Sequence, residues 1–194
     1  MQYIIEHLEP MSEWLGLEYR HCAEIASVLF TNVTNKSEQE TIGDFAKWTE
    51  KSCLKHLGAN EAIVLDPKAE QLLEPADFKK HTAIVIGGIL GDAVPRGRTY
   101  EKITNKLNSV PRSLGPYQLS IDGATFLAKR IEEGHTLMDL EVANQPKIQI
   151  SENEETTLHY AIPVFDGKPI ITPGLLDYLK GENEPPTDST GTEE

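Results

Sequence analysis

The segment at residues 82–92, TAIVIGGILGD, limits the possible folds of this chain more than any other. Its apolar run at 84–86 lacks alternating polar residues, which is typical of a strand buried on both faces of a sheet. Gly87 and Gly88 follow at once, and glycine lets the backbone approach another group closely. In open α/β sheets ligands bind beyond the carboxyl ends of the strands. The sequence therefore predicts a small-molecule site at this loop.

Two more apolar runs, at residues 3–5 and 62–65, have the same character and are followed by Glu6 and Asp66. Stretches with helical patterns separate the three runs. This alternation predicts an α/β fold with a mostly parallel sheet and flanking helices. Because parallel strands end at one edge, we expect the two carboxylates and the glycine loop on the same rim.

Capping residues mark the expected helices. Ser12 is a typical N-cap for a helix that runs to about residue 26. A capping-box pattern at 37–40 predicts a second helix, with Gly58 as its end. Ser120 is expected to cap a later helix that ends at Gly134.

The C-terminal part reads as strands and a last helix. We expect a hairpin between residues 147–150 and 159–164, and a tight turn at Asp166-Gly167. No internal repeat or change of composition divides the chain, so residues 1–181 are expected to form one domain. Residues 182–194 contain five acids and no bases, and we expect a disordered acidic tail.

Several features favour a cytoplasmic protein. The longest apolar runs are about five residues, whereas a membrane helix needs roughly 20. The N-terminus has no basic segment of the kind that begins a secretory signal. Cys22 and Cys53 form no recognisable pair, which favours a reducing compartment.

The net charge is −13, and residues 1–181 still carry −8. Nucleic acid is a polyanion whose binding usually requires a basic face. A cationic protein segment is electrostatically an easier partner. Solubility alone is an equally good explanation of the charge.

Common catalytic motifs are absent from the sequence. It contains no GxxxxGK[ST] phosphate loop, no GxGxxG and no GxSxG. The six histidines show no metal-ligand spacing, so no metal site is expected. Taken alone, the glycine turn after residue 86 is as often a tight structural loop as a binding site.

The order of several segments resembles the SPOUT methyltransferases, which bind S-adenosylmethionine in a C-terminal trefoil knot. More narrowly, it resembles a branch that methylates an arginine of a small-subunit ribosomal protein. The similarity covers about residues 1–180, and the knot is expected from the resemblance alone. The segments that carry it are YIIEH at 3–7, SEW at 12–14, LEY at 17–19, LDP at 65–67, GGILGD at 87–92, PR at 95–96, RT at 98–99, LG at 114–115, Gln118, GKPI at 167–170 and LD at 176–177.

The resemblance implies a cofactor pocket with glycine-rich walls. Glycines and apolar residues suit an adenine, which needs an apolar slot and a few backbone hydrogen-bonding groups. The implied cofactor-binding residues are Leu65, Asp66, Pro67, Gly87, Gly88, Leu90, Gly91, Leu114, Gly115, Gln118 and Leu119.

Methyl transfer to arginine requires a carboxylate, because the guanidinium stays protonated in proteins. A carboxylate can orient one nitrogen and accept its proton. The expected catalytic residues are Asp92, which adjoins the cofactor loop, then Glu18 and Glu6. Each has an ordinary alternative, such as capping a turn or facing solvent.

The expected substrate-binding residues are Glu13, Trp14, Tyr19, Arg96 and Arg98. The aromatic rings suit stacking on a guanidinium, and the arginines suit a cofactor carboxylate or an RNA phosphate. Such aromatic residues are more often core or helix-packing groups, the arginines could form surface ion pairs, and Glu13 could serve only the start of a helix.

The resemblance thus favours a protein-arginine methyltransferase with a cationic ribosomal protein as partner, acting as a monomer rather than a dimer. Two alternatives stay open. One is an RNA methyltransferase, which a basic groove around Arg96, Arg98, Lys102 and Lys106 would favour. The other is a non-catalytic ribosome-binding module that keeps only the fold.

Overall fold

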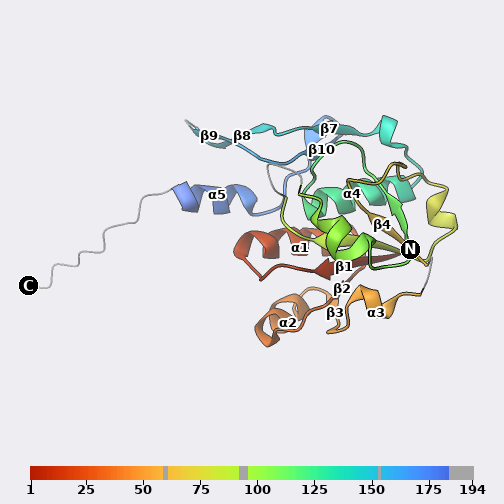
Figure 1. Cartoon of the computed structure of the whole chain (residues 1–194). Helices are drawn as coiled ribbons and strands as arrows, with labels where there is room; N and C mark the ends of the chain where they lie inside the picture. Colours follow the sequence, from red (N-terminus) through yellow and green to blue (C-terminus); the bar gives the residue numbers. More distant parts are fainter. Residues whose placement is uncertain (59–60, 92–95, 153, 184–194) are drawn as a thin grey trace, which may run out of the picture.

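The computed structural model describes residues 1–58, 61–91, 96–152 and 154–183 of the 194-residue chain. A six-stranded sheet lies at its centre in the order β3-β2-β1-β5-β4-β6 (Figure 1). Every neighbouring pair in this sheet is parallel, which confirms the predicted α/β fold. The strands are β1 (Gln2–His7), β2 (Val28–Thr31), β3 (Lys47–Trp48), β4 (Ala62–Leu65), β5 (Ala83–Gly88) and β6 (Val110–Arg112).

The helices flank this sheet, and the two longest begin at the predicted caps. The Ser12 hydroxyl accepts a hydrogen bond from the Leu15 amide at 3.1 Å, and the Ser120 hydroxyl accepts one from the Gly123 amide at 3.1 Å. Helices in the described part are α1 (Glu13–Ile25), α2 (Lys36–Gly43), α3 (Cys53–His56), α4 (Ile121–Glu132) and α5 (Leu175–Asn183), with short turns at Asp77–Lys79, Tyr100–Thr104 and Leu137–Asp139.

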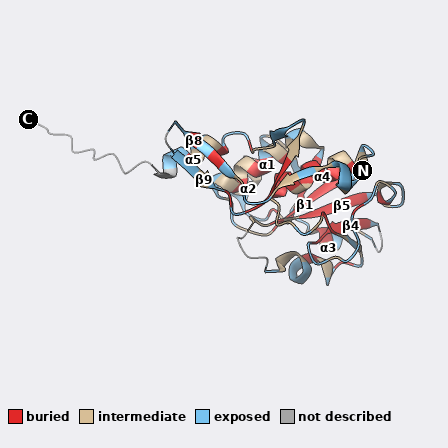
Figure 2. Ribbon diagram, turned by 90° about the horizontal axis from the view of Figure 1, so that it is seen from above, coloured by how far each residue is buried: buried red, intermediate tan, exposed pale blue. Residues whose placement is uncertain are grey.

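Alternate residues of the central strands supply two cores. Tyr3, Ile5 and Ile84 face one side, where they join the cluster formed by α1 and α4. Ile4 and Val85 belong to a smaller cluster on the other side, which includes Cys53 of α3 and Ile103 of the Tyr100–Thr104 turn. Figure 2 shows the central strands as the most buried part of the molecule. Burial on both faces explains why these strands are continuous apolar runs.

The C-terminal segment forms two small antiparallel sheets beside the main one. β10 (Ile162–Phe165) pairs with β7 (Glu141–Ala143) and β11 (Lys168–Pro169), and β8 (Lys147–Ser151) pairs with β9 (Glu154–Thr157). Side chains of β8 and α5 form a third apolar cluster, against which Trp14 of α1 packs. α5 therefore packs against both β8 and α1 (Figure 1).

The predicted helix from 37 to 58 is wrong in extent. α2 is capped by Asn35 rather than by Ser37, begins at Lys36 and ends at Gly43. The chain then extends so that β3 can pair with β2, and the separate helix α3 starts at Cys53. The pairing of β3 with the sheet outweighs the helical spacing of apolar residues beyond Gly43.

The predicted late hairpin is also wrong, because β8 pairs with β9 rather than with residues 159–164. β9 has the sequence EETT, which contains no apolar residue and therefore does not predict a strand. The predicted turn at Asp166-Gly167 is confirmed. Both residues have positive φ angles, 51° and 71°, as a two-residue hairpin turn between β10 and β11 requires.

Other expectations fall partly outside the described residues. The predicted tail at 182–194 lies there from residue 184 onward. The trefoil knot stays a prediction. Among the described residues no helix is both long and apolar enough to span a bilayer.

Gly88 is required by packing at the end of β5. It lies opposite His7 in the register of β1 and β5. A Cβ atom at Gly88 would lie 2.3 Å from the Tyr19 hydroxyl and 2.7 Å from the backbone oxygen of Glu6. Tyr19 is fully buried, so neither neighbour has room to retreat.

Gly88→Ala should lower the free energy of unfolding by about 1–3 kcal/mol, because the new methyl group overpacks this contact. Urea denaturation measures the change. Gly181→Ala is the matched control, since a Cβ there meets nothing within 4 Å and alanine favours the helix. Equal stability of Gly88→Ala and the wild type would contradict the packing described here.

Candidate active site

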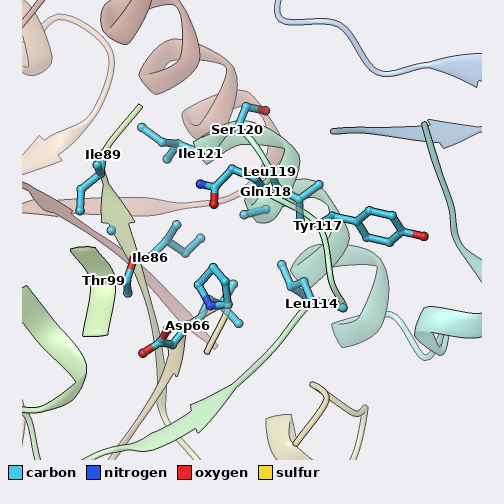
Figure 3. A pocket seen from close by; sticks show the side chains of 15 residues that line it. Asp66, Ile86, Ile89, Thr99, Leu114, Tyr117, Gln118, Leu119, Ser120 and Ile121 are labelled. Atoms are coloured by element: carbon cyan, nitrogen blue, oxygen red, sulfur yellow. The ribbon is translucent and has the colours of Figure 1, made fainter. Parts of the chain in front are cut away.

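A pocket opens at the carboxyl ends of β4 and β5, where the sequence predicts the ligand site. Three segments build it: the residues after β4, the end of β5, and the loop that leads into α4 (Figure 3). We call it the sheet-end pocket; its lining residues are Leu65, Asp66, Pro67, Ile86, Gly87, Ile89, Thr99, Leu114, Gly115, Tyr117, Gln118, Leu119, Ser120, Ile121 and Ala124.

Apolar and polar groups both line this pocket, and the Asp66 carboxylate among them is engaged. The Asp66 carboxylate accepts hydrogen bonds from the Thr104 hydroxyl at 2.6 Å and from the Lys68 amide at 2.9 Å. In Figure 3 the amide of Gln118 points into the space between Ile86 and Ile121. Gly115 has a φ of +93°, a conformation that a residue with a Cβ rarely adopts.

Eight of the eleven residues expected at a cofactor line this pocket: Leu65, Asp66, Pro67, Gly87, Leu114, Gly115, Gln118 and Leu119. Gly88, Leu90 and Gly91 do not. The lining residues that were not predicted are Ile86, Ile89, Thr99, Tyr117, Ser120, Ile121 and Ala124. Several of these residues are adjacent in the sequence to predicted ones. The predicted loops therefore already indicated which segments would line the pocket.

A second pocket lies beside the first, between α1, the loop after β5, the segment after β9 and α5. We call it the Glu18 pocket; it is lined by Trp14, Glu18, Leu90, Gly91, Thr156, Thr157, Leu158, His159, Tyr160 and Leu179. Trp14 makes edge-to-face ring contacts with Tyr160 and Tyr178. The sequence predicted Trp14 and Glu18 as functional residues, but it gave no sign of Tyr160.

Glu18 is the buried carboxyl group of this pocket, with 0% of its surface exposed. One oxygen accepts a hydrogen bond from the Trp14 indole N–H at 2.8 Å, and the other accepts one from the Ile121 amide at 2.9 Å. Burial, together with the nearby Asp122 carboxylate, raises the pKa of Glu18 to about 8. The group is therefore poised to gain or lose a proton near neutral pH.

The two pockets share a thin wall. Leu119 lines the sheet-end pocket, and the residue paired with it, Ala161, follows Tyr160 of the Glu18 pocket. A Cβ at Gly91 would lie 3.3 Å from the Tyr160 Cβ and 3.6 Å from the Leu119 carbonyl oxygen. Because Gly91 has no side chain, the loop after β5 can pass close to both Tyr160 and Leu119.

Basic side chains line the outer side of the sheet-end pocket. Lys68, Arg96 and Arg98 share a neighbouring hollow with Pro67, Ile89, Gly97, Thr99, Pro116, Tyr117 and Gln118. Arg98 also holds the loop after β5: its guanidinium pairs with Glu9 and donates to the Leu90 carbonyl at 2.8 Å. Glu9 in turn accepts from the Leu90 amide at 2.9 Å. Nothing in the sequence pattern had indicated Glu9.

Glu6, expected to be catalytic, is a structural bridge. Its carboxylate accepts hydrogen bonds from the Thr31 and Ser52 hydroxyls, both at 2.5 Å, and from the Cys53 amide at 2.8 Å. These contacts join β1 to β2 and to the start of α3. Glu6 lines neither the sheet-end pocket nor the Glu18 pocket.

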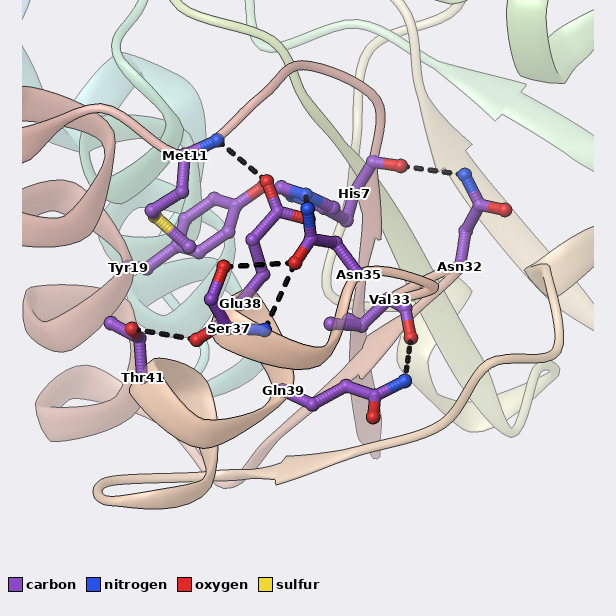
Figure 4. Close-up of polar contacts among 10 residues, drawn as sticks. All are labelled: His7, Met11, Tyr19, Asn32, Val33, Asn35, Ser37, Glu38, Gln39 and Thr41. Atoms are coloured by element: carbon purple, nitrogen blue, oxygen red, sulfur yellow. Dashed lines mark hydrogen bonds and ion pairs between the residues drawn. The ribbon is translucent and has the colours of Figure 1, made fainter.

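Tyr19 is likewise separate from both pockets. Its hydroxyl lies 3.0 Å from the Nδ1 atom of His7, whose Nε2 atom lies 3.2 Å from Glu38 of α2 (Figure 4). Glu13 is exposed in the first turn of α1. Asp92, the first expected catalytic residue, lies outside the described residues.

The remaining titratable side chains form no metal centre in the described ranges. No group of three or more histidine, cysteine, aspartate or glutamate residues there could hold a metal ion. Cys22 and Cys53 are both buried free thiols.

Known proteins resemble this chain along nearly its whole length. Protein arginine N-methyltransferase SFM1 of Saccharomyces cerevisiae is 32% identical over 204 residues, covering 94% of this chain and 96% of the yeast protein. The crystal structure of yeast SFM1 complexed with SAM superposes with a TM-score of 0.82 at 30% identity, over 93% of this chain and 90% of that one. The structure complexed with SAH has a TM-score of 0.79 at 30% identity, over 92% and 94%.

More distant structures share the fold. Trm10 from Thermococcus kodakaraensis is 19% identical with a TM-score of 0.54, over 72% of this chain and 96% of that one. These relatives confirm the predicted SPOUT-type architecture. A family described as protein arginine N-methyltransferase SFM1-like matches residues 2–185. This chain is therefore a member of the SFM1-like family of protein arginine N-methyltransferases.

Proposed function

We propose that this protein transfers a methyl group from S-adenosylmethionine to an arginine side chain of a small-subunit ribosomal protein. The observation that carries the proposal is the pair of adjoining pockets on either side of Leu119 and Gly91. One lies at the strand ends, where nucleotide-like ligands bind, and combines apolar walls with a few polar groups. The other offers aromatic rings and a buried carboxyl group.

The sheet-end pocket fits an adenosine. Leu65, Leu114 and Ala124 supply apolar surface, and Gln118 directs an amide into the space. At Gly87 a Cβ would lie 3.3 Å from the Thr99 hydroxyl, so the glycine keeps this wall open. Lys68 and Arg96 at the outer side suit the cofactor's carboxylate. The bound sulfonium would supply an electrophilic methyl group.

The Glu18 pocket fits the acceptor arginine. Trp14 and Tyr160 offer aromatic faces on which a guanidinium can stack, and Glu18 offers a carboxyl group for its N–H donors. For transfer, one guanidinium nitrogen would have to contact the sulfonium methyl group directly where Gly91 and Leu119 separate the two pockets. Such placement converts a bimolecular encounter into a nearly unimolecular step.

Glu18 is the favoured proton acceptor among the described residues. A carboxyl group with a pKa raised to about 8 is a stronger base than an ordinary glutamate once it is ionised. Pairing with a guanidinium favours the ionised form. Asp92 follows Gly91 in the sequence and is a second candidate for the same step.

The charge of the chain supports a ribosomal protein as acceptor. Proteins that bind ribosomal RNA need cationic segments to neutralise phosphates, and such segments are attracted by a chain of net charge −13. We place the reaction in the cytoplasm, with the enzyme acting as a monomer. Binding of RNA through Arg96 and Arg98 is the competing possibility that the first experiment addresses.

Incubation with methyl-labelled S-adenosylmethionine and purified small ribosomal subunits should label protein and not RNA. The label should survive nuclease, be released by protease and return as methylarginine after hydrolysis. Subunits stripped of protein are the control. Label that is sensitive to nuclease alone would instead make the protein an RNA methyltransferase, and absence of label despite cofactor binding would leave a non-catalytic module.

Glu18→Gln should lower kcat by about 100-fold or more, which is typical for loss of a general base. In the wild type, kcat/KM for the acceptor should rise with pH towards a plateau, with a midpoint near the pKa of about 8, because only the ionised carboxylate accepts a proton. Trp14→Phe should move that midpoint upward, since the lost indole N–H stabilised the ionised form.

Glu24→Gln is the control, because Glu24 is exposed and lies on α1 away from both pockets. Calorimetry should find cofactor affinity within about threefold of wild type for all these variants. A Glu18→Gln enzyme with wild-type kcat and an unchanged pH profile would remove Glu18 from the chemistry.

Gly87→Val should weaken cofactor binding by about tenfold or more, because its side chain would fill the pocket beside Thr99 and Ile89. Isothermal titration with S-adenosylhomocysteine measures the affinity. Gly181→Ala serves as the control, since that residue lies far along the chain in α5 and meets nothing. Unchanged affinity in Gly87→Val would place the cofactor elsewhere.

A further inference from the structure

The β8–β9 hairpin has an open edge beside the Glu18 pocket. Within the described ranges β9 pairs only with β8, so its other side carries no strand. The same segment continues into Leu158 and Tyr160, which line the pocket together with Thr156 and Thr157. A row of backbone groups on β9 therefore leads towards the buried carboxyl group of Glu18.

The register shows which backbone groups face outward. Thr156 lies opposite Ile148, and the Leu158 amide donates to the Pro146 carbonyl at 3.1 Å. In an antiparallel ladder, residues whose amides point to the partner alternate with residues whose amides point away. The amides and carbonyls of Glu155 and Thr157 consequently point away from β8. Within the ranges that the structure describes, no other strand pairs with them.

The acidic side chains at this edge favour a strand of positive charge as its binding partner. Glu152, Glu154 and Glu155 are all exposed on or next to the hairpin strand. Acidic side chains on an edge strand repel another acidic strand, and this chain is strongly acidic, so pairing with a second copy is disfavoured. A cationic extended segment has the complementary charge.

A buried hydroxyl group in the same pocket lacks a partner. Tyr160 is only 4% exposed, and its hydroxyl makes no hydrogen bond within the described structure. A buried polar atom without a partner is costly, which marks a place where a bound polar group would be stabilised. A guanidinium has enough donors to satisfy Tyr160 and Glu18 at once.

We propose that the acceptor protein binds as an extended cationic segment that adds a strand to the open edge of β9 and directs its arginine into the Glu18 pocket. This proposal rests on the proposed arginine methylation. Backbone pairing would supply affinity for many sequences, while the pocket would select the side chain. Main-chain hydrogen bonds to Glu155 and Thr157 are its specific requirement.

Thr157→Pro tests that requirement, because proline removes an outward N–H without removing a hydrogen bond to β8. With labelled S-adenosylmethionine and the separated small-subunit proteins as acceptors, we expect kcat/KM to fall about tenfold, mainly through KM. Glu155→Pro removes the other outward amide of β9 and should act in the same direction.

Gln149→Pro is the matched control, since its amide points away from β9 on the far edge of the hairpin. It should keep wild-type activity, and all variants should keep cofactor affinity and melting temperature. Equal kcat/KM in both β9 proline variants and Gln149→Pro would overturn the proposal while leaving arginine methylation intact. A wild-type dimer that Thr157→Pro dissociates would also overturn it, by making the edge an interface between copies. If the wild type labels no protein, the proposed function fails and this inference fails with it.

Discussion

The buried carboxyl group of Glu18 holds the site together. It connects the indole of Trp14, one turn earlier on α1, to the amide of Ile121, the first residue of α4. The next residue, Asp122, is tied to His21 of α1 at 2.7 Å and to Thr172, before α5, at 2.6 Å. Three helices are therefore fixed by two neighbouring carboxyl groups, and both pockets form against this junction.

This arrangement costs stability. A helix N-terminus and two N–H donors favour the ionised form of Glu18, but burial and Asp122 oppose it more strongly, so its pKa rises to about 8. The folded pKa is above the unfolded one, and the folded state therefore binds more protons between them. Stability contributed by the protonated form is lost as pH rises through about 8. A cationic acceptor beside the ionised group would compensate for that loss, which links binding of arginine to the electrostatics of the site.

The sequence predicted the parts of this architecture that depend on local pattern. Apolar runs gave β1, β4 and β5, caps at Ser12 and Ser120 gave the starts of α1 and α4, and the strand ends gave the sheet-end pocket. Contacts between distant residues left no such pattern. The ion pair of Arg98 with Glu9, which holds Leu90, and the pairing of β9, which has no apolar residue, both depend on the folded chain.

Two predicted residues illustrate the same limit. Glu6 follows an apolar run at a strand end, as a catalytic acid would, yet its oxygens hold Thr31, Ser52 and Cys53. Gly88 looks like part of a binding loop, yet packing against Tyr19 requires it. The sequence pattern predicts that a residue lies on the rim of the sheet. It does not predict which groups that residue contacts there.

The protonation of Glu18 can be observed directly through its neighbour. The indole N–H of Trp14 donates to the carboxyl group, so its ¹⁵N–¹H resonance should titrate with a midpoint near pH 8, and Trp48 on the outermost strand should not titrate with it. Adding the acceptor protein should lower that midpoint, because a bound guanidinium stabilises the carboxylate. A Trp14 resonance that does not change across neutral and alkaline pH, with or without acceptor, would contradict a titrating carboxyl group at the acceptor site.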